Sequence, residues 1–130
     1  MLSITDLEVQ FGTFRAVDKL SLTVPSGSLF GLLGPNGAGK TTTLHCVTGL
    51  LTEYTGTIRV DGLDPKSDNR EVRRRIGLVP QKLALYEDLS VIDNLKTFAA
   101  LYGLRGSALK QRVDWGIEAV HADRACVFRQ

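Results

Sequence analysis

The stretch GPNGAGKT at residues 34–41 constrains the fold of this 130-residue chain more than any other feature. It fits the pattern G-x-x-x-x-G-K-[ST], in which a glycine-rich loop leads into a helix. The unbroken apolar run Leu29–Leu33 precedes the loop, and apolar residues at helical spacing follow Lys40. A buried strand, a loop and a helix in this order are typical of an α/β fold. The pattern therefore predicts a phosphate-binding loop at a strand–helix junction.

Each residue type in this loop suits phosphate. Glycine lets the backbone adopt conformations closed to residues with a Cβ, so that successive N–H groups form a nest for oxygens at a helix N-terminus. The Lys40 ammonium would reach the β- and γ-phosphates as a catalytic group, and the Thr41 hydroxyl would ligate Mg²⁺. The predicted nucleotide-binding residues of the loop are Gly34, Pro35, Asn36, Gly37, Ala38, Gly39, Lys40, Thr41 and Thr42. The alternative is a glycine-rich turn that binds nothing.

Period-two alternation predicts an antiparallel patch. Leu20–Val24 and Thr57–Asp61 each alternate apolar with polar residues, as strands with one wet face do. The N-terminal segment alternates too, but its phase changes at Thr5-Asp6, which indicates a bulge or a break. Two runs do not alternate, Leu29–Leu33 and Ile76–Val79. We expect both to be buried strands of a parallel core sheet.

Helical spacing and caps predict the remaining elements. One helix runs from Lys40 to about Leu50, with Leu44, Val47 and Leu51 on its apolar side. A second begins at Ser90, with Asp93 reaching back to cap it, buries Val91, Leu95, Phe98 and Tyr102, and ends at Gly103. A third follows Ser107, with Leu109, Val113, Ile117 and Val120 at helical spacing. Asp68 with Glu71 caps a shorter helix, whose arginines 70, 73, 74 and 75 form a solvated face.

Charge and composition exclude several classes of protein. The formal net charge of +2 argues against a nucleic-acid surface. No apolar run reaches membrane-spanning length, so we expect no direct membrane insertion and a cytoplasmic location. Cys46 and Cys126 lack metal-type spacing and are interpreted as reduced thiols. A GTP-binding switch protein would carry N-K-x-D and D-x-x-G, and neither occurs; a small P-loop kinase stays possible on size.

Beyond the loop, FGTFRAVDKLSLTVPSGSLFGLLG precedes GPNGAGKTTTL, and IGLVPQKLALYEDLSVIDNLKTFAALYGL follows. Together these segments resemble the nucleotide-binding domain of ATP-binding cassette (ABC) transporters, over almost the whole chain. The segment DNLKTFAALYGL looks most like the ATP-binding subunits of bacterial exporters. The resemblance implies a P-loop NTPase fold with ATP and Mg²⁺ as cofactors. It also implies a nucleotide-binding core at residues 1–89 and the start of a helical subdomain at 90–130.

The resemblance assigns roles to residues outside the loop. Phe11, before Gly12, matches the aromatic residue that stacks on adenine, with Phe14 as its rival and ordinary strand packing as the alternative. Val17 would line the same base. Gln81 matches the glutamine that touches Mg²⁺ or the attacking water, a role that suits a side chain which orients water without ionising. We therefore expect Gln81 to be a catalytic and metal-binding residue.

Phosphoryl transfer to water needs further groups, and the family supplies them from an apolar run ending in Asp-Glu, a switch histidine and a Leu-Ser-Gly-Gly-Gln segment. None of these occurs in the sequence. We therefore expect an N-terminal half of an ABC ATPase domain that does not hydrolyse ATP alone and that is marginally stable or associates with itself. The expected partners are a second ATP-binding domain and a transmembrane permease, which would hold the chain at the inner face of the membrane. A non-catalytic P-loop interaction module stays open as an alternative, ahead of the small kinase.

Overall fold

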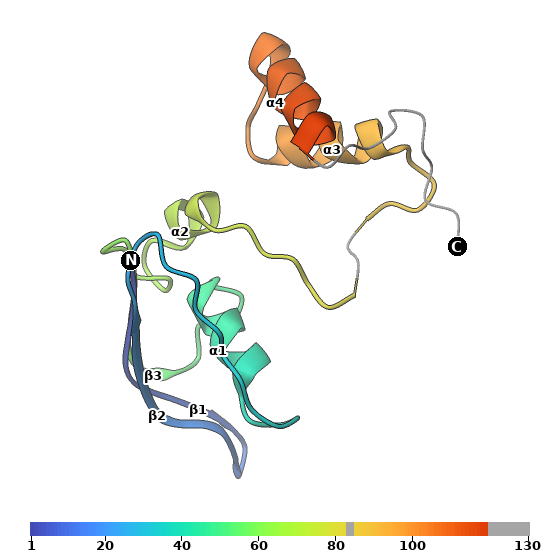
Figure 1. Cartoon of the computed structure of the whole chain (residues 1–130). Helices are drawn as coiled ribbons and strands as arrows, with labels where there is room; N and C mark the ends of the chain where they lie inside the picture. Colours follow the sequence, from blue (N-terminus) through green and yellow to red (C-terminus); the bar gives the residue numbers. More distant parts are fainter. Residues whose placement is uncertain (83–84, 120–130) are drawn as a thin grey trace. The chain divides into compact units, whose positions relative to one another are not determined.

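The computed structural model describes residues 1–82 and 85–119. The chain divides into two compact units, residues 1–78 and residues 79–130 (Figure 1). The first unit contains β1 (Leu2–Phe11), β2 (Phe14–Val24), α1 (Lys40–Val47), β3 (Thr55–Val60) and α2 (Asn69–Arg75). The second contains α3 (Val91–Leu101) and α4 (Gly106–Ala119). The predicted boundary between residues 89 and 90 stays a prediction.

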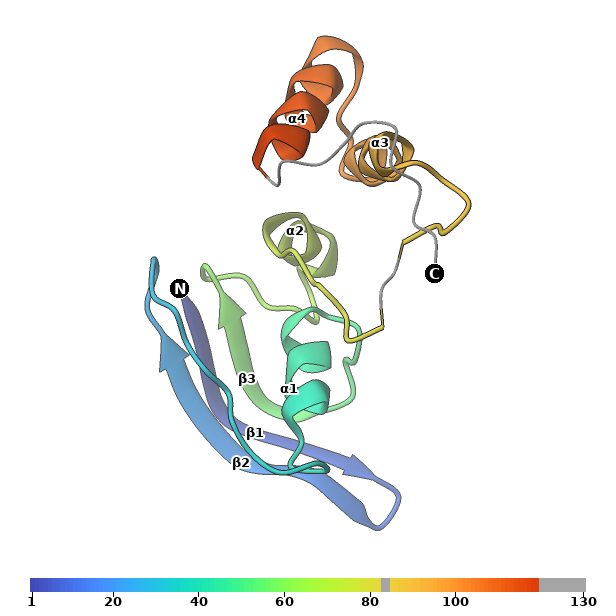
Figure 2. The same cartoon turned by 45° about the vertical axis from the view of Figure 1, so that its right-hand side comes forward.

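The first unit is built on an antiparallel sheet, as the alternation predicts, and its strand order is β2-β1-β3. Helix α1 lies along one face of this curved sheet (Figure 2). Alternate strand residues point toward α1, and the fully buried ones include Leu7, Val9 and Ile58. Cys46 and Val47 of α1 complete the same core. The helix that begins at the loop is therefore fixed against the sheet by apolar packing.

The predicted bulge in β1 is confirmed. The pairing of β1 with β2 shifts register between Ile4 and Leu7, and Asp6 adopts a positive φ of 48°. The shift lets Ile4 and Leu7 both point into the core although they lie an odd number of residues apart. Gly56 makes room for the bulge, because a Cβ there would lie 2.3 Å from the Asp6 carbonyl oxygen.

Helix α1 begins at Lys40, as predicted, but ends about three residues earlier than expected. Gly49 takes a left-handed φ of 68°, and the Leu50 N–H bonds back to the His45 carbonyl at 2.9 Å, which terminates the helix. The predicted apolar face is partly wrong, because the Leu44 side chain is 46% exposed. Thr43 and Cys46 are buried in its place. Thr43 tolerates burial because its hydroxyl donates to the Gly39 carbonyl at 2.9 Å.

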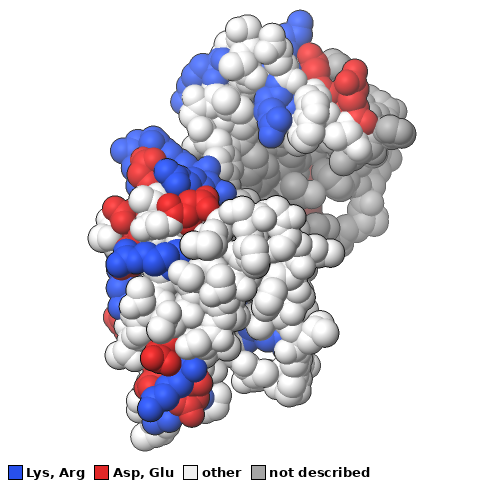
Figure 3. Space-filling view, turned by 60° about the vertical axis from the view of Figure 1, so that its left-hand side comes forward, with Lys and Arg blue, Asp and Glu red and all other residues white. Residues whose placement is uncertain are grey.

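Helix α2 is attached to the end of α1 through the Gly49 carbonyl. That oxygen accepts hydrogen bonds from Asn69 Nδ2 at 2.7 Å and from the Arg73 guanidinium at 2.9 Å. Asp68 is the N-cap residue of α2, as predicted, but its carboxylate accepts from the Asp64 N–H and makes no side-chain cap bond to the helix. The four arginines of this segment are exposed, as expected. Figure 3 shows basic and acidic side chains mixed over this unit.

The two predicted parallel strands are not formed. Residues 28–35 and 76–80 have no strand assignment, and Leu29 and Leu33 are 104% and 92% exposed. A strand needs a neighbour that satisfies its N–H and C=O groups, and among the described residues neither run belongs to the β2-β1-β3 sheet. The apolar composition of both runs favours burial, but burial as a strand depends on such a neighbour.

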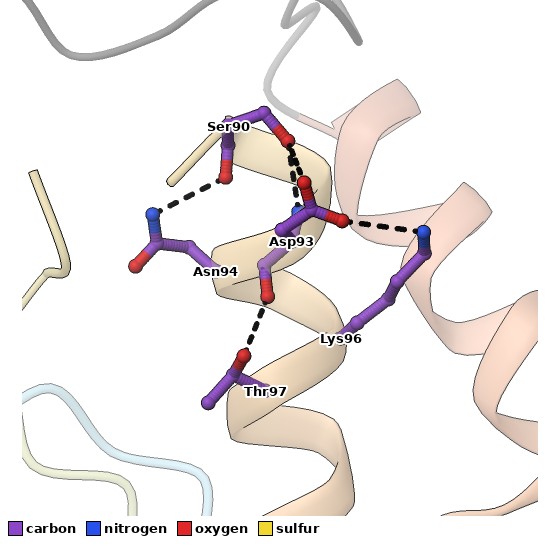
Figure 4. A network of polar contacts seen from close by, with 5 residues as sticks. All are labelled: Ser90, Asp93, Asn94, Lys96 and Thr97. Atoms are coloured by element: carbon purple, nitrogen blue, oxygen red, sulfur yellow. Dashed lines mark hydrogen bonds and ion pairs between the residues drawn. The ribbon is translucent and has the colours of Figure 1, made fainter. Parts of the chain in front are cut away.

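In the second unit, α3 begins as predicted. The Ser90 hydroxyl oxygen accepts the Asp93 N–H at 3.2 Å, and the same hydroxyl donates to the Asp93 carboxylate at 2.6 Å (Figure 4). Gly103 ends the helix with a φ of 85°. The predicted buried stripe is only partly formed, because Val91, Leu95 and Phe98 are half-buried and Tyr102 is 55% exposed. The one fully buried side chain of α3 is polar, that of Asn94.

A short connection joins α3 to α4, and the two helices pack against each other. Val113 and Ile117 are buried, as their spacing predicts, and Gly116 lies close to the Leu95 methyl groups of α3. The predicted contribution of Val120 lies outside the described residues. Across residues 1–82 and 85–119, no helix combines the length and the apolar character needed to span a bilayer.

Candidate functional site

The glycine-rich loop contains a tight turn. The Ala38 N–H bonds to the Pro35 carbonyl at 3.3 Å, and Gly37, the third residue of the turn, has a φ of 84°. A positive φ at this position favours glycine. The loop thus reverses direction over four residues before it enters α1.

The junction between loop and helix rests on β2. Gly39, the residue before α1, has a φ of 78°, and a Cβ there would lie 2.3 Å from the Ala16 carbonyl oxygen and 2.9 Å from Val17 Cγ2. Only glycine combines that backbone conformation with such a close approach. Contact with Ala16 and Val17 therefore fixes the start of α1 against the second strand.

The Lys40 side chain folds back over the loop. Its ammonium donates hydrogen bonds to the Gly34 and Pro35 carbonyls, both at 2.7 Å. The lysine is only partly exposed. These two bonds place a positive charge at the loop, which suits the binding of an anion.

The first turn of α1 has free backbone N–H groups. Gly39 provides no side-chain cap, and there is no acidic residue in the first turn. The amides at the start of the helix therefore keep their partial positive charge for an external acceptor. An anion at this helix end would be stabilised without competition from a carboxylate of the same turn.

The hydroxyl groups that follow Lys40 differ in their surroundings. Thr41 is exposed, Thr42 is partly buried, and Thr43 is turned inward to the Gly39 carbonyl. An exposed hydroxyl is a suitable ligand for Mg²⁺, which is usually held by one or two protein groups together with phosphate oxygens. In the described ranges no group of three or more His, Cys, Asp or Glu side chains could form a metal cage. The residues therefore fit a metal bound jointly with a phosphate.

A cavity of about 450 Å³ lies beside the loop. Ala16, Val17 and Leu20 of β2 line one side, Leu32 and Leu33 line another, and the loop and Lys40 border it. Sequence reasoning named Val17 but missed Arg15 and Asp18, which also line this cavity and form an ion pair at 2.9 Å. The structure thus brings Val17 together with the loop residues Gly37, Ala38 and Lys40.

The other predicted residues lie elsewhere. Phe11 and Phe14 pair across the end of the β1–β2 hairpin, are 52% and 61% exposed, and do not line the cavity. Gln81 is exposed and belongs to the second unit, whereas the loop belongs to the first.

Two buried titratable groups lie in the core of the first unit, away from the cavity lining. Burial raises the pKa of the Cys46 thiol to about 11, so this thiol stays protonated near neutral pH and is a poor nucleophile. Burial likewise raises the pKa of Tyr54 to about 12. Cys126 lies outside the described residues.

Comparison with known proteins identifies a family. A family model described as "ABC transporter" matches residues 17–126. The Probable multidrug ABC transporter ATP-binding protein YbhF of Escherichia coli (strain K12) is 40% identical over 119 residues, which are 92% of this chain and 21% of that protein. The Nod factor export ATP-binding protein I of Cupriavidus metallidurans is 42% identical over 113 residues, 87% of this chain and 37% of that protein.

A solved structure described as an ATP binding subunit of an ABC transporter superimposes with a TM-score of 0.80 at 26% identity. It covers 97% of this chain, and the chain covers 53% of it. The likeness confirms the predicted α/β fold of ABC ATPase domains, of which the chain spans about half, and the chain spans less than two fifths of either curated relative. Because the family model matches most of its sequence, the chain belongs to the ABC transporter family.

Proposed function

We propose that the chain binds ATP with Mg²⁺ as part of the subunit that energises an ABC transporter. The observation that supports this function is the loop at residues 34–41. There the Lys40 ammonium bonds to two loop carbonyls at the start of a helix whose first turn has no acidic side chain. A cation and free helix amides at one place favour a polyphosphate.

Different residues would bind the phosphates, the metal and the base of the nucleotide. The Lys40 ammonium and the first-turn amides of α1 bind the β- and γ-phosphate oxygens, and the Thr41 hydroxyl holds Mg²⁺. Phe11 adds a flat face for the base, since more than half of its side chain is exposed. Gln81 is the residue proposed to orient water or contact the metal, since its side chain cannot ionise. Bound ATP supplies the triphosphate whose hydrolysis drives transport.

The names of the relatives support a role in export. One curated relative is named as a probable multidrug transporter protein and another as a Nod factor export protein. The partners of this chain would be a second ATP-binding domain and a transmembrane permease, with the chain on the cytoplasmic side. The sequence contains no apolar run ending in Asp-Glu, so the carboxylate that hydrolysis needs would come from outside residues 1–130. We expect no steady release of phosphate by this chain alone.

Calorimetric titration of the chain with ATP in excess Mg²⁺ tests the proposal. We expect saturable binding, and we expect Lys40→Ala to weaken it by at least about tenfold because a charge-assisted contact to phosphate is lost. Lys110→Ala is the matched control, since Lys110 is exposed on α4, and it should bind as the wild type does.

Two outcomes would contradict the proposed ATP binding, and a third would contradict the expected lack of hydrolysis. Wild-type protein that is folded by circular dichroism but binds no ATP would favour the alternative of an interaction module, in which the loop has only a structural role. Equal ATP affinities of the wild type and Lys40→Ala would show that Lys40 of the loop does not contribute to ATP binding. Steady phosphate release that depends on Lys40 would overturn the expected lack of hydrolysis.

A further inference from the structure

The cavity beside the loop has a charged rim that the proposed phosphate contacts do not use. Its walls are apolar side chains of β2 and of residues 32 and 33, and Lys40 borders it at the loop. Besides Lys40, the charged residues that line it are Arg15 and Asp18. An apolar cavity with a few polar groups is the usual form of a small-molecule site.

Arg15 and Asp18, which both line the cavity, form an ion pair with each other on β2. Arg15 donates a hydrogen bond to an Asp18 carboxylate oxygen at 2.9 Å, and both side chains are more than half exposed. An exposed pair of this kind adds little to folding stability. The remaining carboxylate oxygen keeps lone pairs for another donor, because an ionised carboxylate accepts several hydrogen bonds.

The position of the phosphates limits what lies in this cavity. In a nucleotide bound at the loop, the ribose is the group next to the phosphates, and Gly37, Ala38 and Lys40 line both the loop and the cavity. The hydrogen-bonding side chains that β2 offers in the cavity lining are those of Arg15 and Asp18. A sugar has hydroxyl groups to donate to a carboxylate, and its carbon face suits apolar walls.

We propose that the ribose of the nucleotide lies in this cavity and that the Asp18 carboxylate accepts hydrogen bonds from its hydroxyl groups. The proposal rests on the proposed ATP binding. A lone carboxylate near a triphosphate would repel it, and the Arg15 guanidinium offsets that charge. Asp18 therefore determines specificity for ribonucleotides, and Arg15 is its positioning residue.

The test compares two nucleotides on the same protein. ATP and 2′,3′-dideoxyATP are titrated by calorimetry with excess Mg²⁺, and the ratio of their dissociation constants is measured. We expect the wild type to favour ATP by about three- to tenfold, the effect of a hydrogen bond to a charged but exposed acceptor. Asp18→Ala should bring the ratio close to one, and Asp18→Asn, which keeps one acceptor oxygen, should give an intermediate ratio.

Because the ratio is taken within one variant, a general loss of stability cancels. Asp88→Asn removes an exposed carboxylate of the second unit and should keep the wild-type ratio. A wild type that binds both nucleotides equally, or an Asp18→Ala variant that still discriminates, would overturn the ribose assignment and leave ATP binding at the loop intact. Failure of the wild type to bind either nucleotide would overturn both.

Discussion

Among single residues, Gly39 has the strictest environment in the candidate site. Its φ is 78°, and a Cβ would lie 2.3 Å from the Ala16 carbonyl oxygen. Gly39→Ala therefore combines an unfavourable left-handed backbone with a clash against β2. We predict a loss of about 3 kcal/mol or more in the free energy of unfolding, measured by urea titration with circular dichroism.

Gly27→Ala is the matched control for this prediction. Gly27 has a similar φ of 74°, but a Cβ there would meet no atom within 4 Å. The expected loss is about 1–2 kcal/mol, that of the backbone conformation alone. If both variants lost the same free energy of unfolding, the close approach of Gly39 to β2 would not contribute to the cost of the substitution.

The loop residues could be predicted from the sequence, whereas the neighbours of the loop could not. Glycine at 34 and 39 and lysine at 40 belong to a spacing that is typical of a phosphate-binding loop. Arg15 and Asp18 belong to no such spacing. Their place depends on the pairing of β2 with β1, which shifts register between Leu7 and Val9 and again between Val9 and Gln10. A register shift of this kind leaves no clear mark in the sequence.

At the scale of elements, Asn94 attaches the segment before α3 to the helix. Its side-chain oxygen accepts the Tyr86 N–H at 2.9 Å, and its amide donates to the carbonyls of Tyr86, Leu89 and Ser90. The side chain is 2% exposed. We predict that Asn94→Ala lowers the free energy of unfolding of the second unit by about 2–4 kcal/mol, because buried backbone groups lose their partners.

The single tryptophan, Trp115 on α4, reports the unfolding of this unit by its fluorescence. Gln111→Ala serves as the control, since it removes an exposed amide from α4 and should change the midpoint little. Amide exchange gives a second readout, in which the Tyr86 N–H should lose protection in Asn94→Ala. Retained protection at Tyr86 would show that Asn94 does not hold this segment.

Asp93 makes the stability of α3 depend on pH. The hydrogen bond from the Ser90 hydroxyl, and then the bond from Lys96, lower the pKa of this carboxyl below its ordinary value of 3.8. A lowered pKa in the folded state means that the stabilisation is present above the ordinary pKa and is lost as the pH falls through the folded-state pKa. Asp93→Asn should therefore be less stable than the wild type near neutral pH.

Urea midpoints across a pH series, read by Trp115 fluorescence, check this expectation. The difference between the wild type and Asp93→Asn should shrink from about pH 4 downward. Glu53→Gln, in the first unit, should leave the fluorescence midpoint of the second unit unchanged at each pH. A difference between the wild type and Asp93→Asn that stays constant with pH would rule out the carboxylate as its cause.

Features that depend on residues close together in the sequence could be predicted. Features that depend on contacts with residues far along the chain could not. The start of α3 follows from Ser90 and Asp93, three residues apart, which need no partner outside the helix. The burial of Asn94 depends on the path of the segment from Tyr86 to Ser90, and no helical period indicates it. Leu29–Leu33 has the composition of a buried strand, yet whether it forms one depends on a neighbouring strand elsewhere in the fold.

At the scale of the whole molecule, the first unit has a packed core and an exposed apolar segment. Leu29 and Leu33 are almost fully exposed, and the segment around them has no strand partner in the described residues. Apolar side chains and unpaired backbone groups on one segment favour association with another chain. We predict that the wild type self-associates in sedimentation velocity runs, with a sedimentation coefficient that rises with protein concentration.

Replacement of both leucines tests whether this segment is the cause. Leu29→Ser combined with Leu33→Ser should abolish the concentration dependence, because each buried leucine would otherwise contribute about 1.5–3 kcal/mol to the contact. The free energy of unfolding should stay close to that of the wild type, since neither side chain packs in the core. Leu7→Ala, at a fully buried position, should show the opposite behaviour, with a loss of about 2–5 kcal/mol in stability. A wild type that stays monomeric at every concentration would mean that the exposed segment is not an association site.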